Sequence, residues 1–289
     1  MRNLTLTGTP GDPSLTVLGA LRRWVGELRQ NRLLIHSLFW RLYLHRFEGS
    51  AAGWLWVVIM PCVPLAVYST LQTMGLFSAS LLNSGQDLPR AVYSGWGILF
   101  FLSFAEGLRL AAGTLVHHRR EIIQTGIPKM VLLVVNTLHA LGDTLLRAAA
   151  LVLIILFFRV APHPGIAWAP VLLLALTAFG FGLGCVLSLI AVYYRDLLNI
   201  LSAALSYLFF ASGVFIHIPD HDKQPAMDLL LKFLHWQPLY IIVDQSRELA
   251  FGWADRPWAL ACSILFCFAV VPIGLTLYYR GESLVNSHL

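Results

Sequence analysis

The sequence has few charged side chains and very few lysines. Charged residues make up 12% of its 289 positions and hydrophobic residues 57%, whereas a soluble globular domain has roughly 25% charged residues. Lysine occurs only at positions 129, 223 and 232 and never follows glycine, so a phosphate-binding loop of the GxxxxGK[ST] type is absent. This composition predicts an integral membrane protein that does not bind ATP through such a loop.

Motifs for catalysis and for metal binding are also missing. The sequence contains neither HExxH nor GxSxG, and its cysteines fall in apolar stretches without CxxC or Cys/His spacing: Cys62, Cys185, Cys262 and Cys267. The formal charge of +5 comes from basic residues spread through loops, without the aromatic interleaving of a nucleic-acid surface. We therefore expect no catalytic residue, metal or cofactor on this chain, and no nucleic-acid partner.

Long apolar segments dominate what is present. Six of them are close to the length that crosses a bilayer. They cover residues 53–78, 91–116, 131–158, 167–193, 200–216 and 258–279. The prediction is an all-α membrane protein with six transmembrane helices. Twelve Lys and Arg residues fall on the side of the termini and six on the other, which favours cytoplasmic termini.

Two regions do not fit simple spans. A basic helix-forming segment at about 15–30 precedes residues 31–50, which are apolar but carry basic side chains, as in a helix lying in the membrane interface. Residues 217–252 contain two apolar runs that are too short to cross and are separated by Pro238. Short re-entrant helices before the last span are therefore expected. The predicted division is an N-terminal segment, 1–52, and a six-span domain, 53–289.

Ionisable residues inside the predicted spans form two sets. Glu106 and Arg109 are three residues apart, and Asp143 and Arg147 are four apart, so each set lies on one helix face. Such residues could form an ion or proton pathway, or they could be structural pairs. Local neutralisation within each pair favours the structural interpretation.

Aromatic side chains that lie deeper than the interfacial belts form another candidate set. Flat apolar rings could line a wide pore and let sugar rings slide past, although core packing is the commoner role of such rings. The candidates are Phe100, Phe101, Phe104, Tyr207 and Phe210.

Several stretches resemble a known family, the permease subunits of type-2 ABC exporters for polysaccharides. They are "HRFEGSAAGWLWVVIMPCVPL" at 45–65, "LFFLSFAEGLRLAAGTLVHHRREIIQTGIPKMVLL" at 99–133, "VYYRDLLNIL" at 192–201 and "HWQPLYIIVDQSRELAFG" at 235–252. The resemblance implies a homodimer with a pore between the copies, driven by two copies of a separate ABC ATPase that binds ATP and Mg²⁺. The implied cargo is a lipid-linked polysaccharide of O-antigen or capsule type, exported across a bacterial inner membrane.

The resemblance also implies roles for particular residues. A coupling helix at 117–127 would dock on the ATPase through His117, His118, Arg119, Arg120, Glu121, Ile122 and Ile123. A cytoplasmic gate that meets lipid headgroups would contain Trp40, Arg41, Tyr43 and Arg46, although membrane anchoring alone would also explain these residues. Arg195 and Asp196 would contact the ATPase or pair across the bundle, and the outer helices would include Pro238, Arg247 and Glu248.

Two other functions fit the same residues. A membrane enzyme acting on polyprenyl-linked sugars would need a catalytic acid or base that the substrate can reach. The candidates within the predicted spans are Glu106 and Asp143. A type-2 ABC permease for a small lipid or drug would share the six-span plan.

Overall fold

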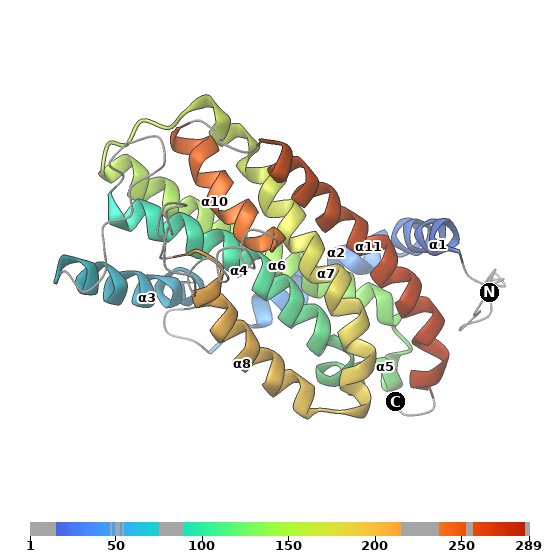
Figure 1. The fold of residues 1–289 in the computed structure, drawn as a ribbon. Coiled ribbons are helices and arrows are strands. Elements are labelled where there is room, and N and C mark those ends of the chain that lie inside the picture. The colour runs from blue at the N-terminus through green and yellow to red at the C-terminus, as the bar shows by residue number, and fades with distance from the viewer. Residues whose placement is uncertain are drawn as a thin grey trace.

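The chain is all helical wherever the structure describes it (Figure 1). The computed structural model describes residues 16–46, 48–49, 53, 55–74, 89–214, 237–252 and 257–286. Its helices are α1 (Val17–Gln30), α2 (Arg32–His45), α3 (Leu55–Thr73), α4 (Arg90–His117), α5 (Arg119–Thr125), α6 (Lys129–Phe157), the 3-10 turn η1 (Pro164–Trp168), α7 (Ala169–Tyr193), α8 (Asp196–Ala211), α10 (Pro238–Phe251) and α11 (Pro257–Asn286). The all-α prediction is confirmed for these residues.

Within the described residues, four helices are long and apolar enough to cross a membrane. They cover Val92–His117, Lys129–Phe157, Pro164–Tyr193 and Pro257–Glu282, close to four of the predicted spans. Of the other two predicted spans, α3 has 19 residues and no charged side chain, whereas α8 has only 16. Sixteen helical residues extend about 24 Å, which is less than the ~30 Å hydrocarbon core. The chain is a multi-pass membrane protein, and the total of six spans stays a prediction.

Helix α7 is the centre of the bundle because its glycines let two helices approach closely. Gly180 and Gly184 face α4, and a Cβ placed on Gly184 would lie 2.5 Å from the Cβ of Ala111. Gly182 faces α11, where a Cβ placed on Gly274 would overlap the Gly182 backbone. Small residues at such positions permit the close backbone packing that holds membrane helices together.

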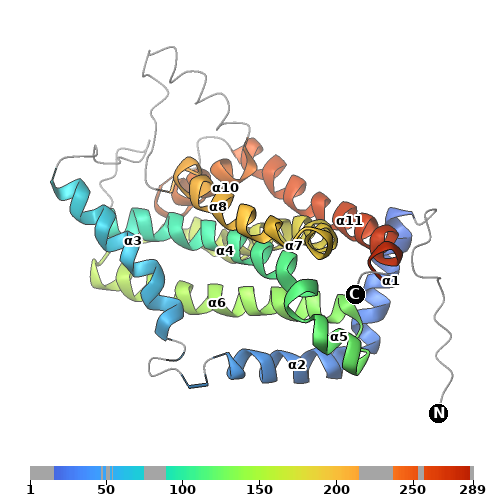
Figure 2. The same cartoon turned by 90° about the horizontal axis from the view of Figure 1, so that it is seen from below.

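The two N-terminal helices take different directions. Helix α1 crosses the long helices near the C-terminal end of α11, whereas α2 runs beside α6 (Figures 1 and 2). His139 Nε2 lies 3.2 Å from the Phe39 carbonyl oxygen, and Tyr43 contacts Asp143 four residues further along α6. The predicted interfacial helix at 31–50 is therefore attached to α6 along its side, and the helix that crosses the bundle is α1.

A small polar cluster fixes α1 to α11. The Arg23 guanidinium pairs with Glu27 at 2.9 Å and with Glu282 at 3.4 Å, and it lies 4.4 Å from the centre of the Tyr279 ring. The Tyr279 hydroxyl donates a hydrogen bond to Glu27 at 3.0 Å. These contacts place the N-terminal helix at the same end of the molecule as α5.

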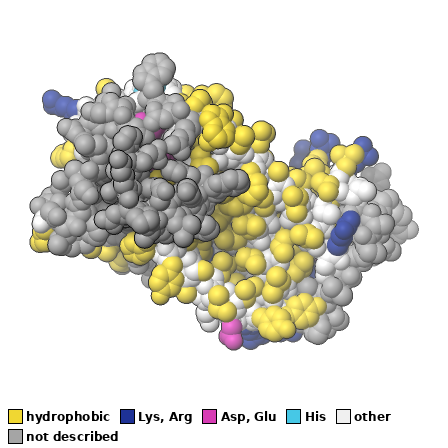
Figure 3. Space-filling view, viewed as in Figure 1, with side chains coloured by type: hydrophobic (Ala, Val, Ile, Leu, Met, Phe, Trp, Pro, Cys, Tyr) yellow, Lys and Arg dark blue, Asp and Glu magenta, His cyan; other side chains and the backbone are white. Residues whose placement is uncertain are grey.

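The predicted re-entrant region is described only in part. Residues 217–236 lie outside the described residues, whereas α10 is a 14-residue helix that packs against α4 and α11. Its side chains from Leu239 to Phe251 are largely buried in the protein. The face of the bundle formed by α7, α8 and α11 is apolar, since Figure 3 shows hydrophobic side chains spread over it, with Lys and Arg near its edges.

Candidate functional site

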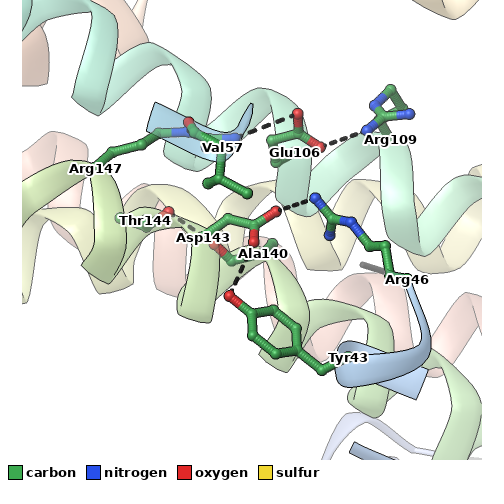
Figure 4. Close-up of polar contacts among 9 residues, drawn as sticks. All are labelled: Tyr43, Arg46, Val57, Glu106, Arg109, Ala140, Asp143, Thr144 and Arg147. Atoms are coloured by element: carbon green, nitrogen blue, oxygen red, sulfur yellow. Dashed lines mark hydrogen bonds and ion pairs between the residues drawn. The ribbon is translucent and has the colours of Figure 1, made fainter. Parts of the chain in front are cut away.

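A buried carboxylate joins α2 to α6 (Figure 4). Asp143 is fully buried, and its Oδ2 accepts a hydrogen bond from Arg46 Nη2 at 2.8 Å. The Tyr43 hydroxyl donates to Oδ1 of the same carboxylate at 3.2 Å. Burial, reinforced by the nearby Asp143 charge, raises the pKa of Tyr43 to about 12, so this hydroxyl keeps its proton at neutral pH. Asp143 thus holds the end of α2 against the middle of α6.

A second carboxylate joins α4 to α6. Glu106 lies 2.7 Å from Arg109 Nη2 on its own helix and 3.7 Å from Arg147 Nη2 on α6. Arg147 Nε also donates to the Val57 carbonyl on α3 at 3.3 Å (Figure 4). These contacts connect three helices through one acidic and two basic side chains.

The predicted pairing of Asp143 with Arg147 is wrong. Glu106 does pair with Arg109, but the ion-pair partner of Asp143 is Arg46, and Arg147 instead reaches Glu106. The prediction rested on residue spacing within one helix, which identifies possible partners only on that same helix. It could not anticipate that α2 and α4 bring closer partners to the two charges of α6.

A cavity of about 620 Å³ opens beside this charged network. It lies between α3, α4 and α8, and its charged lining consists of Arg46, Glu106, Arg109 and Arg147. Aromatic rings and two hydroxyls complete much of the remaining wall: Trp56, Phe101, Phe209, Phe210, Ser202 and Ser206. A site that combines arginines with apolar rings can hold an anionic group and an apolar chain together.

The predicted pore-lining aromatics do not form one surface. Phe101 and Phe210 line the cavity, whereas Phe100 and Phe104 do not. Phe100 is 0% exposed and stacks on Trp96, and Phe104 is 3% exposed and stacks on Phe179. Their prediction as lining residues is therefore corrected, because they belong to the packed interior. Tyr207 is 78% exposed on the outer surface of α8 and lies outside the cavity lining.

The predicted coupling segment forms a short helix between two long ones. It is predicted at 117–127, whereas α5 covers Arg119–Thr125, His117 is the last residue of α4 and His118 caps it. Gly126 ends α5 with a φ of 64°, a left-handed conformation that glycine adopts without a steric penalty.

Side chains of α5 divide into an inner and an outer group. Ile122 is buried against the apolar interior, and Glu121 pairs with His118 at 2.6 Å. Arg119, Arg120 and Ile123 are exposed, so the outer face of α5 offers two cations beside one apolar side chain. That surface suits docking on another protein.

The four predicted gate residues point in two directions. Tyr43 and Arg46 turn towards Asp143, as described above. Trp40 is 49% exposed and donates from Nε1 to His36 at 3.1 Å, and Arg41 is exposed. Trp40 and Arg41 lie on the open surface of α2, whereas Arg46 is partly exposed but turns its guanidinium towards Asp143.

Arg247 is an interior residue of α10. It is 1% exposed, donates to the carbonyl oxygens of Tyr93 at 3.2 Å, Gly213 at 2.8 Å and Val214, and lies 3.9 Å from the centre of the Tyr93 ring. Gly97 leaves room for it, since a Cβ there would overlap Arg247 Nη2. Arg247 therefore ties α10 to α4 and to the end of α8, a role that the sequence did not indicate.

The remaining predicted residues have simpler positions. Pro238 begins α10, where its fixed φ suits the first helical position, and Glu248 is buried on the same helix. Arg195 and Asp196 are exposed at the start of α8, and among the described residues they form no ion pair with each other. The described residues also contain no group of three or more His, Cys, Asp or Glu side chains arranged to hold a metal ion.

Comparison with known proteins decides the family. Residues 34–251 match the family described as ABC-2 type transporter. The chain belongs to the ABC-2 type transporter family. This ABC-2 permease is also similar to the O-antigen export system permease protein RfbA of Myxococcus xanthus, with 26% identity over 210 residues, which are 72% of this chain and 78% of the relative. Membership makes the chain a transporter permease rather than an enzyme, and it implies an ABC ATPase as partner.

Some cavity residues of this ABC-2 permease could not be predicted from the sequence, because only folding brings them together. Val57 of α3 and Ser202 and Ser206 of α8 join the cavity wall although nothing in their local sequence marks them. The sequence did contain one signal for the ion pair between helices, namely opposite charges on two successive predicted spans. They suggest contact between Glu106 and Arg147 once α4 and α6 are taken as neighbours.

Proposed function

We propose that the chain is the membrane subunit of an ATP-driven exporter. Its cargo is a lipid-linked polysaccharide of O-antigen or capsule type, which moves outward across a bacterial inner membrane. The likeness to an O-antigen export permease carries this proposal. The cavity supports it, since arginines and aromatic rings together suit the junction between an anionic headgroup and a lipid chain.

In this proposal two copies of the chain form the pore and two copies of the ATPase drive it. The termini lie in the cytoplasm, and the membrane lipids surround the apolar faces of the helices. ATP and Mg²⁺ bind to the ATPase, so the permease itself carries no cofactor. Helix α5 docks on the ATPase through the exposed side chains of Arg119, Arg120 and Ile123.

The structure offers a path from α5 to the cavity. Helix α5 directly connects α4 and α6, and these two helices carry Glu106 and Arg147. When ATP closes the ATPase dimer, a shift of α5 moves both helices and changes the distance between the two charges. Helix α2 follows because Arg46 attaches it to Asp143. A movement of packed helices of this kind is an established form of switching.

Purification of the tagged chain in a mild detergent, followed by mass spectrometry, tests the ATPase partnership. We expect a P-loop ATPase in equal amount. The double variant R119E/R120E should lose the ATPase because both cations on the docking face are reversed, while the permease stays folded in the membrane.

Arg159→Glu is the matched control, since it reverses an exposed charge at the far end of α6. This variant should retain the ATPase. A wild-type chain that purifies without any ATPase would contradict the partnership, and equal recovery with R119E/R120E would contradict docking through α5.

Export of a small lipid or drug is the second candidate. A cavity of about 620 Å³ falls within the usual range for small-molecule sites, roughly 300–1,000 Å³. The two functions differ in what a cell without the chain would lose, surface polysaccharide or resistance to a small compound. The enzyme hypothesis has no comparable support, because Glu106 and Asp143 are both engaged by arginines.

A further inference from the structure

Arg147 carries an unsatisfied hydrogen-bond donor deep in the protein. Its side chain is 9% exposed; Nε donates to the Val57 carbonyl, and Nη2 lies 3.7 Å from Glu106. Nη1 is buried and has no hydrogen-bond partner among the described residues. A buried charged donor without an acceptor is costly, so it requires an explanation such as a ligand that the free protein lacks.

The unsatisfied guanidinium lines the cavity beside two other arginines. Arg109 is 51% exposed and Arg46 is 39% exposed, so both can reach a molecule in the cavity. Glu106 is the one acidic side chain in the described lining, and Asp143 outside the lining neutralises Arg46, so the three arginines and two carboxylates leave one net positive charge. The local balance of charge therefore favours an anion.

The rest of the cavity favours an apolar chain attached to that anion. Trp56, Phe101 and Phe210 come from three different helices and line the same space as Arg147. A free phosphate ion would leave these rings unused. A lipid with a phosphate group would place its anion at the arginines and its tail along the rings.

We infer that Arg147, together with Arg109, binds the phosphate or diphosphate group of a prenyl-type lipid in this cavity. Glu106 occupies the place of that anion in the empty state, since its carboxylate lies between the same two arginines. Phosphate oxygens would accept hydrogen bonds from Nη1 and Nη2 of Arg147 and displace Glu106. The choice of a prenyl lipid rests on the proposed function, in which the cargo is lipid-linked.

This assignment differs from the headgroup site indicated by the sequence. Arg41 lies on the open surface of α2, and the guanidinium of Arg46 is engaged by Asp143. The structure moves the main anion contact to α4 and α6, whose ends flank α5. Binding of the lipid would then act on the two helices that the ATPase moves.

Binding of geranylgeranyl diphosphate to the full-length chain in detergent micelles tests the inference. Wild-type protein should bind it saturably. Arg147→Gln should weaken binding by about tenfold or more, because charge-assisted hydrogen bonds are lost, and Arg147→Lys should fall between the two because it keeps the charge but not the planar fork. Arg159→Gln, which removes an exposed arginine at the end of the same helix, should bind like wild type.

Glu106→Gln is the decisive variant. Removing the competing carboxylate should tighten binding several-fold, and a gain of affinity cannot result from misfolding. Unchanged affinity in both Arg147→Gln and Glu106→Gln would overturn the inference.

Two further probes identify the source of the phosphate group. Inorganic diphosphate should bind much more weakly than the prenyl compound, because it lacks the tail that the aromatic rings contact. Phosphatidylglycerol should also bind more weakly. Equal affinity for inorganic diphosphate would overturn the lipid assignment, and equal affinity for phosphatidylglycerol would assign the cavity to ordinary phospholipid instead.

Failure of this inference can be separated from failure of the proposed function. If cells need the chain for surface polysaccharide but the Arg147→Gln protein binds the prenyl diphosphate normally, the export function stands and the proposed binding site is rejected. Arg147-dependent binding in a chain whose loss does not affect surface polysaccharide would keep the site and reject the export function.

Discussion

At the scale of single residues, Asp143 and Arg46 form an ion pair whose two members are unequally buried. The Asp143 side chain is 0% exposed, whereas that of Arg46 is 39% exposed. Removing the arginine leaves a carboxylate in the protein interior, while removing the carboxylate leaves an arginine that water can reach. An uncompensated buried charge costs far more than a solvated one.

The two members should therefore respond differently to substitution. Arg46→Gln should reduce the stability of the folded chain by about 3 kcal/mol, and Asp143→Asn by only about 1 kcal/mol. Thermal denaturation in detergent checks this order. The double variant R46Q/D143N should be more stable than R46Q alone, and a double variant that is less stable than either single one would contradict the account.

Arg247 is a second residue whose role depends on its partners. It satisfies carbonyl oxygens from two separate parts of the chain, and those of Gly213 and Val214, which follow the end of α8, would lose their buried donor without it. Arg247→Met should lower stability by at least about 3 kcal/mol, since each unsatisfied group costs roughly 1–3 kcal/mol.

The same measurement has an independent check at Gly97. Gly97→Ala should also destabilise the chain, because the added methyl group overlaps the guanidinium of Arg247. Wild-type melting temperatures for both variants would show that Arg247 does not hold α10 in place.

Residue chemistry was only partly predictable from the sequence. The pair Glu106–Arg109 is present as expected because both members are on one helix. The partners of Asp143 and Arg147 come from α2 and α4, and one-dimensional spacing contains no information on which helices become neighbours. The inward position of Phe100 and Phe104 was missed for the same reason.

At the scale of helices, the glycines of α7 set how closely the bundle packs. Gly184→Ala should destabilise the chain by about 1–3 kcal/mol, because its methyl group would press on Ala111 of α4 and overpacking is unfavourable. Gly26→Ala on α1 is the matched control, since a Cβ there meets nothing within 4 Å. It should be neutral or slightly stabilising, because alanine loses less backbone entropy on folding.

Thermal denaturation and protease resistance in detergent compare these two variants. Equal stability of both would contradict close packing of α7 against α4. A loss confined to Gly184→Ala would show that the helix interface, rather than helix propensity, requires glycine.

Helix positions were predicted better than helix contacts. The predicted spans 91–116 and 131–158 nearly coincide with α4 and α6, because long apolar runs are a strong signal. The direction of α2 was missed, since its basic residues resemble those of an interfacial helix whether or not a carboxylate in α6 binds them. The predicted span 200–216 is displaced along the chain from α8, which begins at Asp196 and ends at Ala211, because the apolar run continues past the end of the helix.

At the scale of the whole molecule, the chain has the apolar surface of a membrane protein. Large apolar side chains are exposed on several helices, among them Leu153 on α6, Phe210 on α8 and Leu265 on α11. Lipid or a second copy of the chain must cover these faces, because apolar patches of this extent are rare on soluble monomers. On α5, Arg119 and Arg120 are exposed together with Ile123, a mixed surface that suits contact with another protein.

The proposed export of a lipid-linked polysaccharide by this permease is tested most directly by the position of that polymer in cells. The measurement is the amount of the polysaccharide at the surface and inside cells after deletion of the gene, with and without a plasmid copy. We predict loss from the surface, accumulation of the lipid-linked form inside, and restoration by the wild-type plasmid. Normal surface polysaccharide in the deletion strain, with no internal accumulation, would contradict the account.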